Sequence, residues 1–180
     1  AVYGDVEQMP ITENSPENPK SPYGFSKYTI EKILKDFDSS YEIKSVILRY
    51  FNAAGSDPEG EIGENHNPET HLIPLILEVI HKTRLFITIF GDDYATDDGS
   101  CIRDYVHVMD IANAHILALK FLLNKKKSAT YNIGSGKGYS VKEVIKHVEE
   151  ITKVSIPRKI GKRRQGDVSA LYSNFQLISK

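Results

Sequence analysis

Two kinds of apolar segment alternate along this 180-residue chain, and this alternation limits the fold more than any other feature. Four segments repeat apolar side chains at helical spacing: 22–39, 71–82, 109–124 and 141–153. Three runs between them are short, apolar and partly β-branched: 44–51, 85–91 and 130–134. A short apolar run that follows a helix is typical of a buried parallel strand. The alternation therefore predicts an α/β protein with mainly parallel strand pairing.

Composition narrows the classes of function. The net charge is −1, whereas a dedicated binder of nucleic acid or of anionic membranes would carry a strong basic excess. The only cysteine, Cys101, excludes an internal disulfide and a cysteine-rich zinc site, and indicates a reducing compartment. No apolar run approaches the roughly 20 residues that span a bilayer. We expect a cytoplasmic protein with neither nucleic acid nor a membrane as partner.

The segment Ser21-Pro22-Tyr23-Gly24-Phe25-Ser26-Lys27 opens the first helix. Serine is a good N-cap, and proline suits the first helical position. Tyr23 and Lys27 are four residues apart, so they lie on one helix face. A nearby cation favours the phenolate, and a tyrosine can then act as a base.

The spacing alone does not establish a site, because Tyr28 and Lys32 repeat it. An incidental tyrosine and lysine on an amphipathic helix would look the same. We expect Tyr23, unlike Tyr28, to share an inward stripe with other apolar side chains of the helix: Ile30, Ile33, Leu34 and Phe37.

Two further regions bear on a site. Asn52 follows the strand at 44–51, in a turn of small residues, and ligands of open α/β sheets bind at the carboxyl ends of strands. His66 and His71 lie in an acidic loop, but their spacing does not place ligands on one helix face, so we predict no metal site there.

An ordered series of motifs identifies a resemblance that covers nearly the whole chain. It reads S-P-Y-G-x-S-K, R-Y-F-N-A-A-G, H-L-I-P, I-F-G-D-D-Y-x-T-x-D-G-x-x-I-R-D-Y-V-H-V-x-D, Y-N-I-G-S-G and R-R-Q-G-D. The series resembles the extended short-chain dehydrogenase/reductase superfamily and, within it, the enzymes that epimerise UDP-sugars at C4. The resemblance implies an isomerase of galactose metabolism that holds NAD in a Rossmann domain and interconverts UDP-glucose and UDP-galactose.

The same resemblance assigns roles to residues. Tyr23 would take the proton of the C4 hydroxyl, and Lys27 would hold the nicotinamide ribose and favour the phenolate. The other matches are Tyr50 at the nicotinamide end, Asn52 on the phosphates, Leu72 in the loop over UDP, Phe90 beside uracil, Arg103 and Arg164 on the diphosphate, Asp167 on the ribose and Leu171 at the back of the sugar pocket. Leucine there favours UDP-glucose and UDP-galactose and leaves N-acetylated UDP-sugars possible.

The resemblance also shows what the sequence lacks. It contains neither the glycine-rich dinucleotide loop nor the serine or threonine that works with the tyrosine. It begins without methionine, and a helical pattern from Ser173 is cut at Lys180. We expect a fragment that by itself neither holds NAD nor turns over.

We expect two domains and a dimer. Residues 1–52 and 103–125 would be the remainder of the Rossmann-type parallel sheet domain. Residues 53–102 and 126–180 would form a smaller, truncated α/β domain that binds the UDP-sugar. Members of the family commonly form homodimers through the helix that carries Tyr23 and Lys27.

Other functions stay open at this point. A nucleotide-sugar 4,6-dehydratase or decarboxylase of the same superfamily would share these motifs, as would a UDP-N-acetylhexosamine 4-epimerase. A non-catalytic binding protein on the same fold is a further alternative. Tyr23, Lys27, Arg103 and Arg164 argue against it, because a silent homologue has no reason to keep all four.

Overall fold

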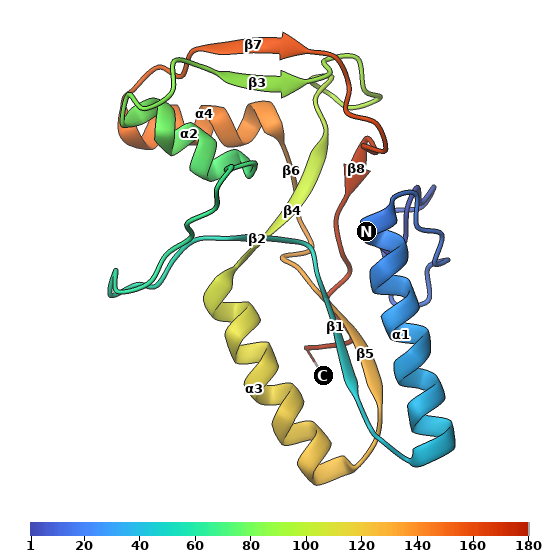
Figure 1. The fold of residues 1–180 in the computed structure, drawn as a ribbon. Helices are drawn as coiled ribbons and strands as arrows, with labels where there is room; N and C mark the ends of the chain where they lie inside the picture. Colours follow the sequence, from blue (N-terminus) through green and yellow to red (C-terminus); the bar gives the residue numbers. More distant parts are fainter. Residues whose placement is uncertain (180) are drawn as a thin grey trace.

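The computed structural model describes residues 1–179 and shows helices and strands alternating along them (Figure 1). The helices are α1 (Pro22–Tyr41), α2 (Leu72–Ile80), α3 (Val108–Lys125) and α4 (Val141–Thr152). The strands are β1 (Val46–Tyr50), β2 (Asn52–Ala54), β3 (Ile87–Phe90), β4 (Ile102–His107), β5 (Ala129–Ile133), β6 (Gly138–Ser140), β7 (Arg158–Gly161) and β8 (Ala170–Leu171).

The strands pair mainly in parallel. β1 pairs with β5, β2 with β4, β3 with β7 and β4 with β8 in parallel, and β6 lies antiparallel to β4. Connections through helices place successive strands in the same direction. The predicted α/β class is therefore confirmed.

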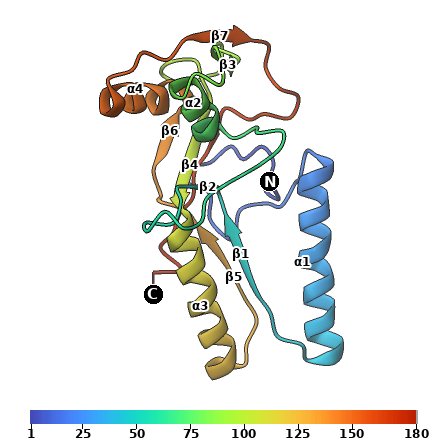
Figure 2. The ribbon, with the colours of Figure 1, turned by 60° about the vertical axis from the view of Figure 1, so that its left-hand side comes forward.

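The elements gather at two ends of the molecule. α1 and α3 flank the β1–β5 pair at one end, and α2 and α4 lie under the β3–β7 pair at the other (Figures 1 and 2). β4 runs between the two ends. The largest buried cluster lies at the β3–β7 end and consists of Ile76, Val79, Ile87, Ile89, Ile145 and Ile156.

Local signals in the sequence explain the helix starts. Ser21 caps α1, and its Oγ accepts a hydrogen bond from the Gly24 amide at 3.1 Å. Ser140 and Glu143 form the reciprocal capping box of α4. Both caps are as the sequence predicts.

Two expectations about local structure were wrong, and three short strands were missed. Residues 52–54 form strand β2 rather than a turn, because their backbone pairs with β4 from Tyr105 to His107. Ser173 does not begin a helix: it pairs with Ile11 in an isolated bridge, and turns follow up to residue 179. The short strands β6, β7 and β8 were not predicted, since two to four residues are too few to show a periodicity.

The predicted inward stripe of α1 is exposed. Tyr23 is 65% exposed and Ile30 is 50% exposed, and Ile33 and Phe37 are exposed as well. Tyr28 instead packs against the buried cluster of Val2, Tyr3 and Ile11. Tyr23, Ile30 and Leu34 line an open cavity beside β1 rather than a packed core.

The division into two domains stays a prediction. It assigns α1 and β1 to one domain and β3, α4 and β7 to the other, and these groups lie at opposite ends (Figure 1). It also assigns β5 to the second domain, although β5 pairs along its whole length with β1.

One buried carboxylate fastens β4 to two loops. Asp104 is fully buried and accepts hydrogen bonds from the amide and hydroxyl of Ser135, at 2.7 Å each. The other oxygen of Asp104 accepts hydrogen bonds from the amide of Ser173 at 3.0 Å and from the hydroxyl of Ser173 at 2.8 Å. A Cβ on Gly134 would lie 2.3 Å from that carboxylate and 2.2 Å from Ser173 Oγ. Only glycine fits between these groups.

Replacing Gly134 by alanine should therefore lower the free energy of unfolding by about 1–3 kcal/mol, the usual cost of forcing atoms into a packed site. Urea unfolding of the variant checks this value. Gly63→Ala is the matched control, because an added Cβ there meets nothing within 4 Å. Equal stability of the two variants would contradict the packing argument.

Candidate active site

Tyr23 and Lys27 lie together on the first two turns of α1, as predicted. Lys27 Nζ is 5.2 Å from the centroid of the Tyr23 ring. Both side chains line a cavity of about 560 Å³, together with Tyr50 from the end of β1 and Leu171 from β8. An exposed phenol beside an ammonium group can exchange a proton with a bound hydroxyl.

The second Tyr/Lys pair differs in its surroundings. Lys32 Nζ lies 4.5 Å from the Tyr28 ring centroid, but it also donates a hydrogen bond to Glu17 at 2.9 Å. This hydrogen bond raises the pKa of Lys32. Among residues 1–179, Lys27 has no ion-pair partner, and its ammonium group lies near the Tyr23 ring.

A buried ion pair fixes α1 beside the sheet. Glu31, two turns beyond Tyr23, pairs with Arg49 of β1, and the side chains are 7% and 6% exposed. Arg49 Nε donates to Glu31 Oε1 at 2.9 Å, and Arg49 also donates to the Tyr3 hydroxyl at 2.7 Å. Burial alone would lower the pKa of Arg49, but the hydrogen bonds to Glu31 and Tyr3 raise it. Arg49 precedes Tyr50, so the pair fixes Tyr23 relative to the end of β1.

A second cavity, of about 880 Å³, contains the two predicted arginines. The Arg164 guanidinium lies over the Phe90 ring, 4.0 Å from its centroid. Arg103 donates to Asp167 at 3.2 Å and to the Val168 carbonyl at 2.9 Å. A planar guanidinium is suited to bidentate binding of phosphate oxygens. This cavity therefore presents two cations suited to an anionic ligand.

The two cavities adjoin. Asn52, Arg103 and Asp167 line both of them. Each of the ten predicted site residues lines at least one cavity: Tyr23, Lys27, Tyr50 and Leu171 the smaller, Leu72, Phe90 and Arg164 the larger, and the three shared residues both. Segments from position 23 to position 171 thus meet in one continuous region.

Four residues of the larger cavity were not predicted as a group. Glu64, His66, Glu69 and His71 line its wall on the loop before α2. The sequence shows them as E-x-H-x-x-E-x-H, a spacing that no helix face explains. The prediction of no metal site rested on that spacing, and the structure brings the four side chains together all the same.

Among the described residues, no helix is both long enough and apolar enough to cross a membrane.

The chain resembles curated UDP-glucose 4-epimerases. The chain is 51% identical over 176 residues to a UDP-glucose 4-epimerase of Halalkalibacterium halodurans, covering 98% of the chain and 53% of that protein. The chain spans about half the length of the curated relatives it matches.

Solved structures show the same fold. A UDP-glucose 4-epimerase of Stenotrophomonas maltophila, solved with bound NAD and formylated UDP-arabinopyranose, superposes with a TM-score of 0.93 at 38% identity, covering 98% of this chain and 53% of that one. The UDP-glucose 4-epimerase of Bifidobacterium longum, in complex with NAD+ and UDP, superposes with a TM-score of 0.92 at 38% identity. The match covers 97% of this chain and 53% of that one.

A model of one family matches residues 1–134, more than half of the chain. The matched part contains the Tyr23–Lys27 pair, Asn52 and Arg103. The chain therefore belongs to the NAD dependent epimerase/dehydratase family.

Proposed function

We propose that the protein containing this chain interconverts UDP-glucose and UDP-galactose by inverting C4 of the sugar, with NAD as its cofactor. One observation carries the proposal: the cavity with Tyr23 and Lys27 adjoins the cavity with Arg103 and Arg164. A ligand that spans both cavities would meet a proton acceptor at one end and two guanidinium groups at the other. A sugar joined to a nucleoside diphosphate has this arrangement of groups.

The smaller cavity fits the reacting end of such a ligand. Tyr23 would accept the proton of the C4 hydroxyl and later return it, with the Lys27 ammonium group 5.2 Å from the centroid of its ring. Tyr23, Lys27 and Tyr50 are the residues of this chain that would hold the nicotinamide end of NAD, because all three line this cavity and Tyr23 and Tyr50 are largely exposed within it. Bound NAD would supply the oxidation of C4 and its re-reduction.

The larger cavity fits the nucleotide end. Arg164 and Arg103 would bind the diphosphate, and Asn52 would add an amide contact. Phe90 offers a ring for uracil, Asp167 an acceptor for ribose hydroxyls, and Leu72 a wall of the UDP site. Arg103 is already paired with Asp167, so a bound diphosphate would compete for that guanidinium.

Leu171 lines the smaller cavity, and its partner in the strand register is Arg103 of β4. Its side chain leaves less space for an N-acetyl group than a small residue would. We infer a preference for UDP-glucose and UDP-galactose over UDP-N-acetylhexosamines.

Four further parts of the proposal concern the whole protein. The division into a Rossmann domain and a UDP-sugar domain stands as given above. The 180 residues alone would neither hold NAD nor turn over. The enzyme would work in the cytoplasm, in a pathway that uses galactose. It would form a homodimer through α1, where Phe25 and Ile33 are exposed and do not line the smaller cavity.

The test uses the protein encoded by the complete reading frame. We expect it to be purified with NAD and to convert UDP-galactose to UDP-glucose without added reductant. Dependence of the conversion on added NADPH, or a 4-keto-6-deoxy product, would contradict the proposal and favour a reductase or a 4,6-dehydratase. Faster turnover of UDP-N-acetylgalactosamine than of UDP-galactose would overturn the role given to Leu171.

A further inference from the structure

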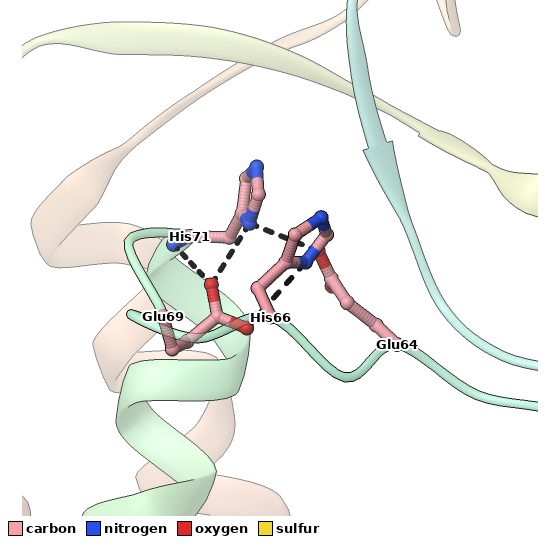
Figure 3. Close-up of side chains that lie close together, drawn as sticks. All are labelled: Glu64, His66, Glu69 and His71. Atoms are coloured by element: carbon pink, nitrogen blue, oxygen red, sulfur yellow. Dashed lines mark hydrogen bonds and ion pairs between the residues drawn. The ribbon is translucent and has the colours of Figure 1, made fainter.

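Two histidines and two glutamates converge on the loop between β2 and α2, at the wall of the larger cavity. They are Glu64, His66, Glu69 and His71, and Figure 3 shows their side chains turned toward one another. One possible ligand atom from each residue lies within 4.8 Å of all the others. The roles proposed above for binding a UDP-sugar use none of these four side chains.

The side chains of these four residues, called the quartet below, lie close to one another. His66 Nδ1 and His71 Nδ1 lie 2.8 Å and 2.9 Å from the same oxygen, Glu64 Oε1. Glu69 Oε1 is 2.8 Å from His71 Nδ1, and Glu69 Oε2 is 3.9 Å from His66 Nδ1. The imidazole rings are tilted by 52°, with centroids 4.9 Å apart, so they are not simply stacked. Each of the four side chains therefore brings a possible ligand atom into one small region.

These distances and donor types suit a transition-metal ion. Zinc binds imidazole nitrogen and carboxylate oxygen at about 2.0–2.2 Å, which places neighbouring ligands of a tetrahedral site about 3.4 Å apart. The four nitrogen–oxygen separations given above, 2.8–3.9 Å, lie around this value, and all four ligand atoms lie within 4.8 Å of one another. Two neutral imidazoles with two carboxylates carry a charge of about −2, which matches a divalent cation. Calcium and magnesium would prefer an all-oxygen set.

One ligand is already held in place by the backbone. Glu69 Oε1 accepts hydrogen bonds from the amides of Thr70 at 2.6 Å and His71 at 2.7 Å. Its side chain is 8% exposed, the least of the four. Such contacts orient a ligand before the metal arrives and usually strengthen metal binding. The positive end of α2, which begins at Leu72, opposes a cation, and the two carboxylates offset that effect.

We propose that Glu64, His66, Glu69 and His71 form a binding site for one divalent transition-metal ion of the Zn²⁺ class. The bound ion would tie residues 64–66 to the start of α2 and so fix the loop at the wall of the larger cavity. This inference does not rest on the proposed epimerase activity, because metal binding is its readout.

The test titrates Zn²⁺ into the full-length protein after dialysis against a chelator, in competition with a chromophoric chelator. We expect one equivalent to bind, and Co²⁺ in its place to show the visible d–d bands of a low-symmetry site with nitrogen ligands. His66→Ala and Glu69→Gln should each weaken Zn²⁺ binding by about a hundred-fold or more, since loss of an outer-shell contact alone costs 10–100-fold.

Two matched controls replace a glutamate and a histidine that do not belong to the quartet. Glu61→Gln changes an exposed carboxylate of the same loop, and His147→Ala removes an exposed histidine that lies 3.4 Å from Glu150. Both should bind Zn²⁺ within about threefold of the unchanged protein, the scatter expected for contacts outside the ligand shells.

Absence of stoichiometric binding would overturn the proposal and leave a cluster of His–Glu ion pairs. Equal losses in the quartet variants and the controls would overturn it as well, as would unchanged binding in His66→Ala and Glu69→Gln. His71→Ala is not the deciding variant, because His71 occupies the N-cap position of α2. His66 is more than half exposed, so its replacement leaves the fold intact and keeps the test decisive.

Discussion

Replacing Tyr23 by phenylalanine should reduce kcat of the full-length protein by about 10²–10⁴-fold, the usual contribution of a positioned acid–base group. The phenyl ring keeps the packing of Tyr23 beside Lys27 and removes only the oxygen that would carry the proton. The affinity for UDP, which the arginines of the other cavity would provide, should change little. Steady-state kinetics and UDP titration of the variant measure both quantities.

Tyr28→Phe is a matched control for this substitution. Tyr28 belongs to the same helix and also has a lysine four residues on, but Lys32 is bound to Glu17 and Tyr28 packs against a buried cluster. Its replacement should leave kcat close to that of the unchanged enzyme. Equal losses in the two variants, or a loss of UDP affinity as large as the loss of kcat in Tyr23→Phe, would contradict the role given to Tyr23.

Replacing Arg49 by methionine should lower the free energy of unfolding by about 3–5 kcal/mol, because it leaves the carboxylate of Glu31 buried without its partner. The Tyr3 hydroxyl loses a hydrogen bond in the same step. Urea unfolding measures the change. At a urea concentration where the variant remains folded, kcat should also fall, since α1 loses its fixed position beside β1.

Arg84→Met is the matched control, because it removes an ion pair at the surface instead of a buried one. Arg84 pairs with Glu78 at 2.7 Å, but both side chains are partly exposed, and such pairs contribute about 0–1 kcal/mol. The double variant Arg49→Met/Glu31→Leu should recover part of the lost stability, because Glu17, the other carboxylate bound to Arg49, still pairs with Lys32. A loss of less than about 1 kcal/mol in the free energy of unfolding for Arg49→Met would contradict this argument. It would mean that the Glu31 carboxylate is solvated in the variant, against its observed burial.

The sequence predicts the fold class well, because the signals for helices and strands are local. Ser21 and Ser140 mark helix starts through their own hydrogen bonds, and the apolar runs mark β1, β3 and β5. The series of motifs indicates residues that the structure brings to two adjoining cavities. Their individual roles stay predictions.

Features that depend on distant partners could not be predicted. Residues 52–54 look like a turn because they are small, and only the backbone of β4 makes them a strand. Glu31 and Arg49 look like solvated charges until α1 and β1 are placed side by side. The cluster of Glu64, His66, Glu69 and His71 escapes a search on helix faces because a loop, not a helix, brings it together.

The wall shared by the two cavities has a thermodynamic consequence. Any ligand that draws Arg103 away from Asp167 changes both cavities at once, because both residues line each of them. The affinities of the two sites are then linked, and by reciprocity each occupant must change the affinity for the other by the same factor. Binding of UDP alone is therefore expected to alter the retention of NAD, even when no sugar is present to react.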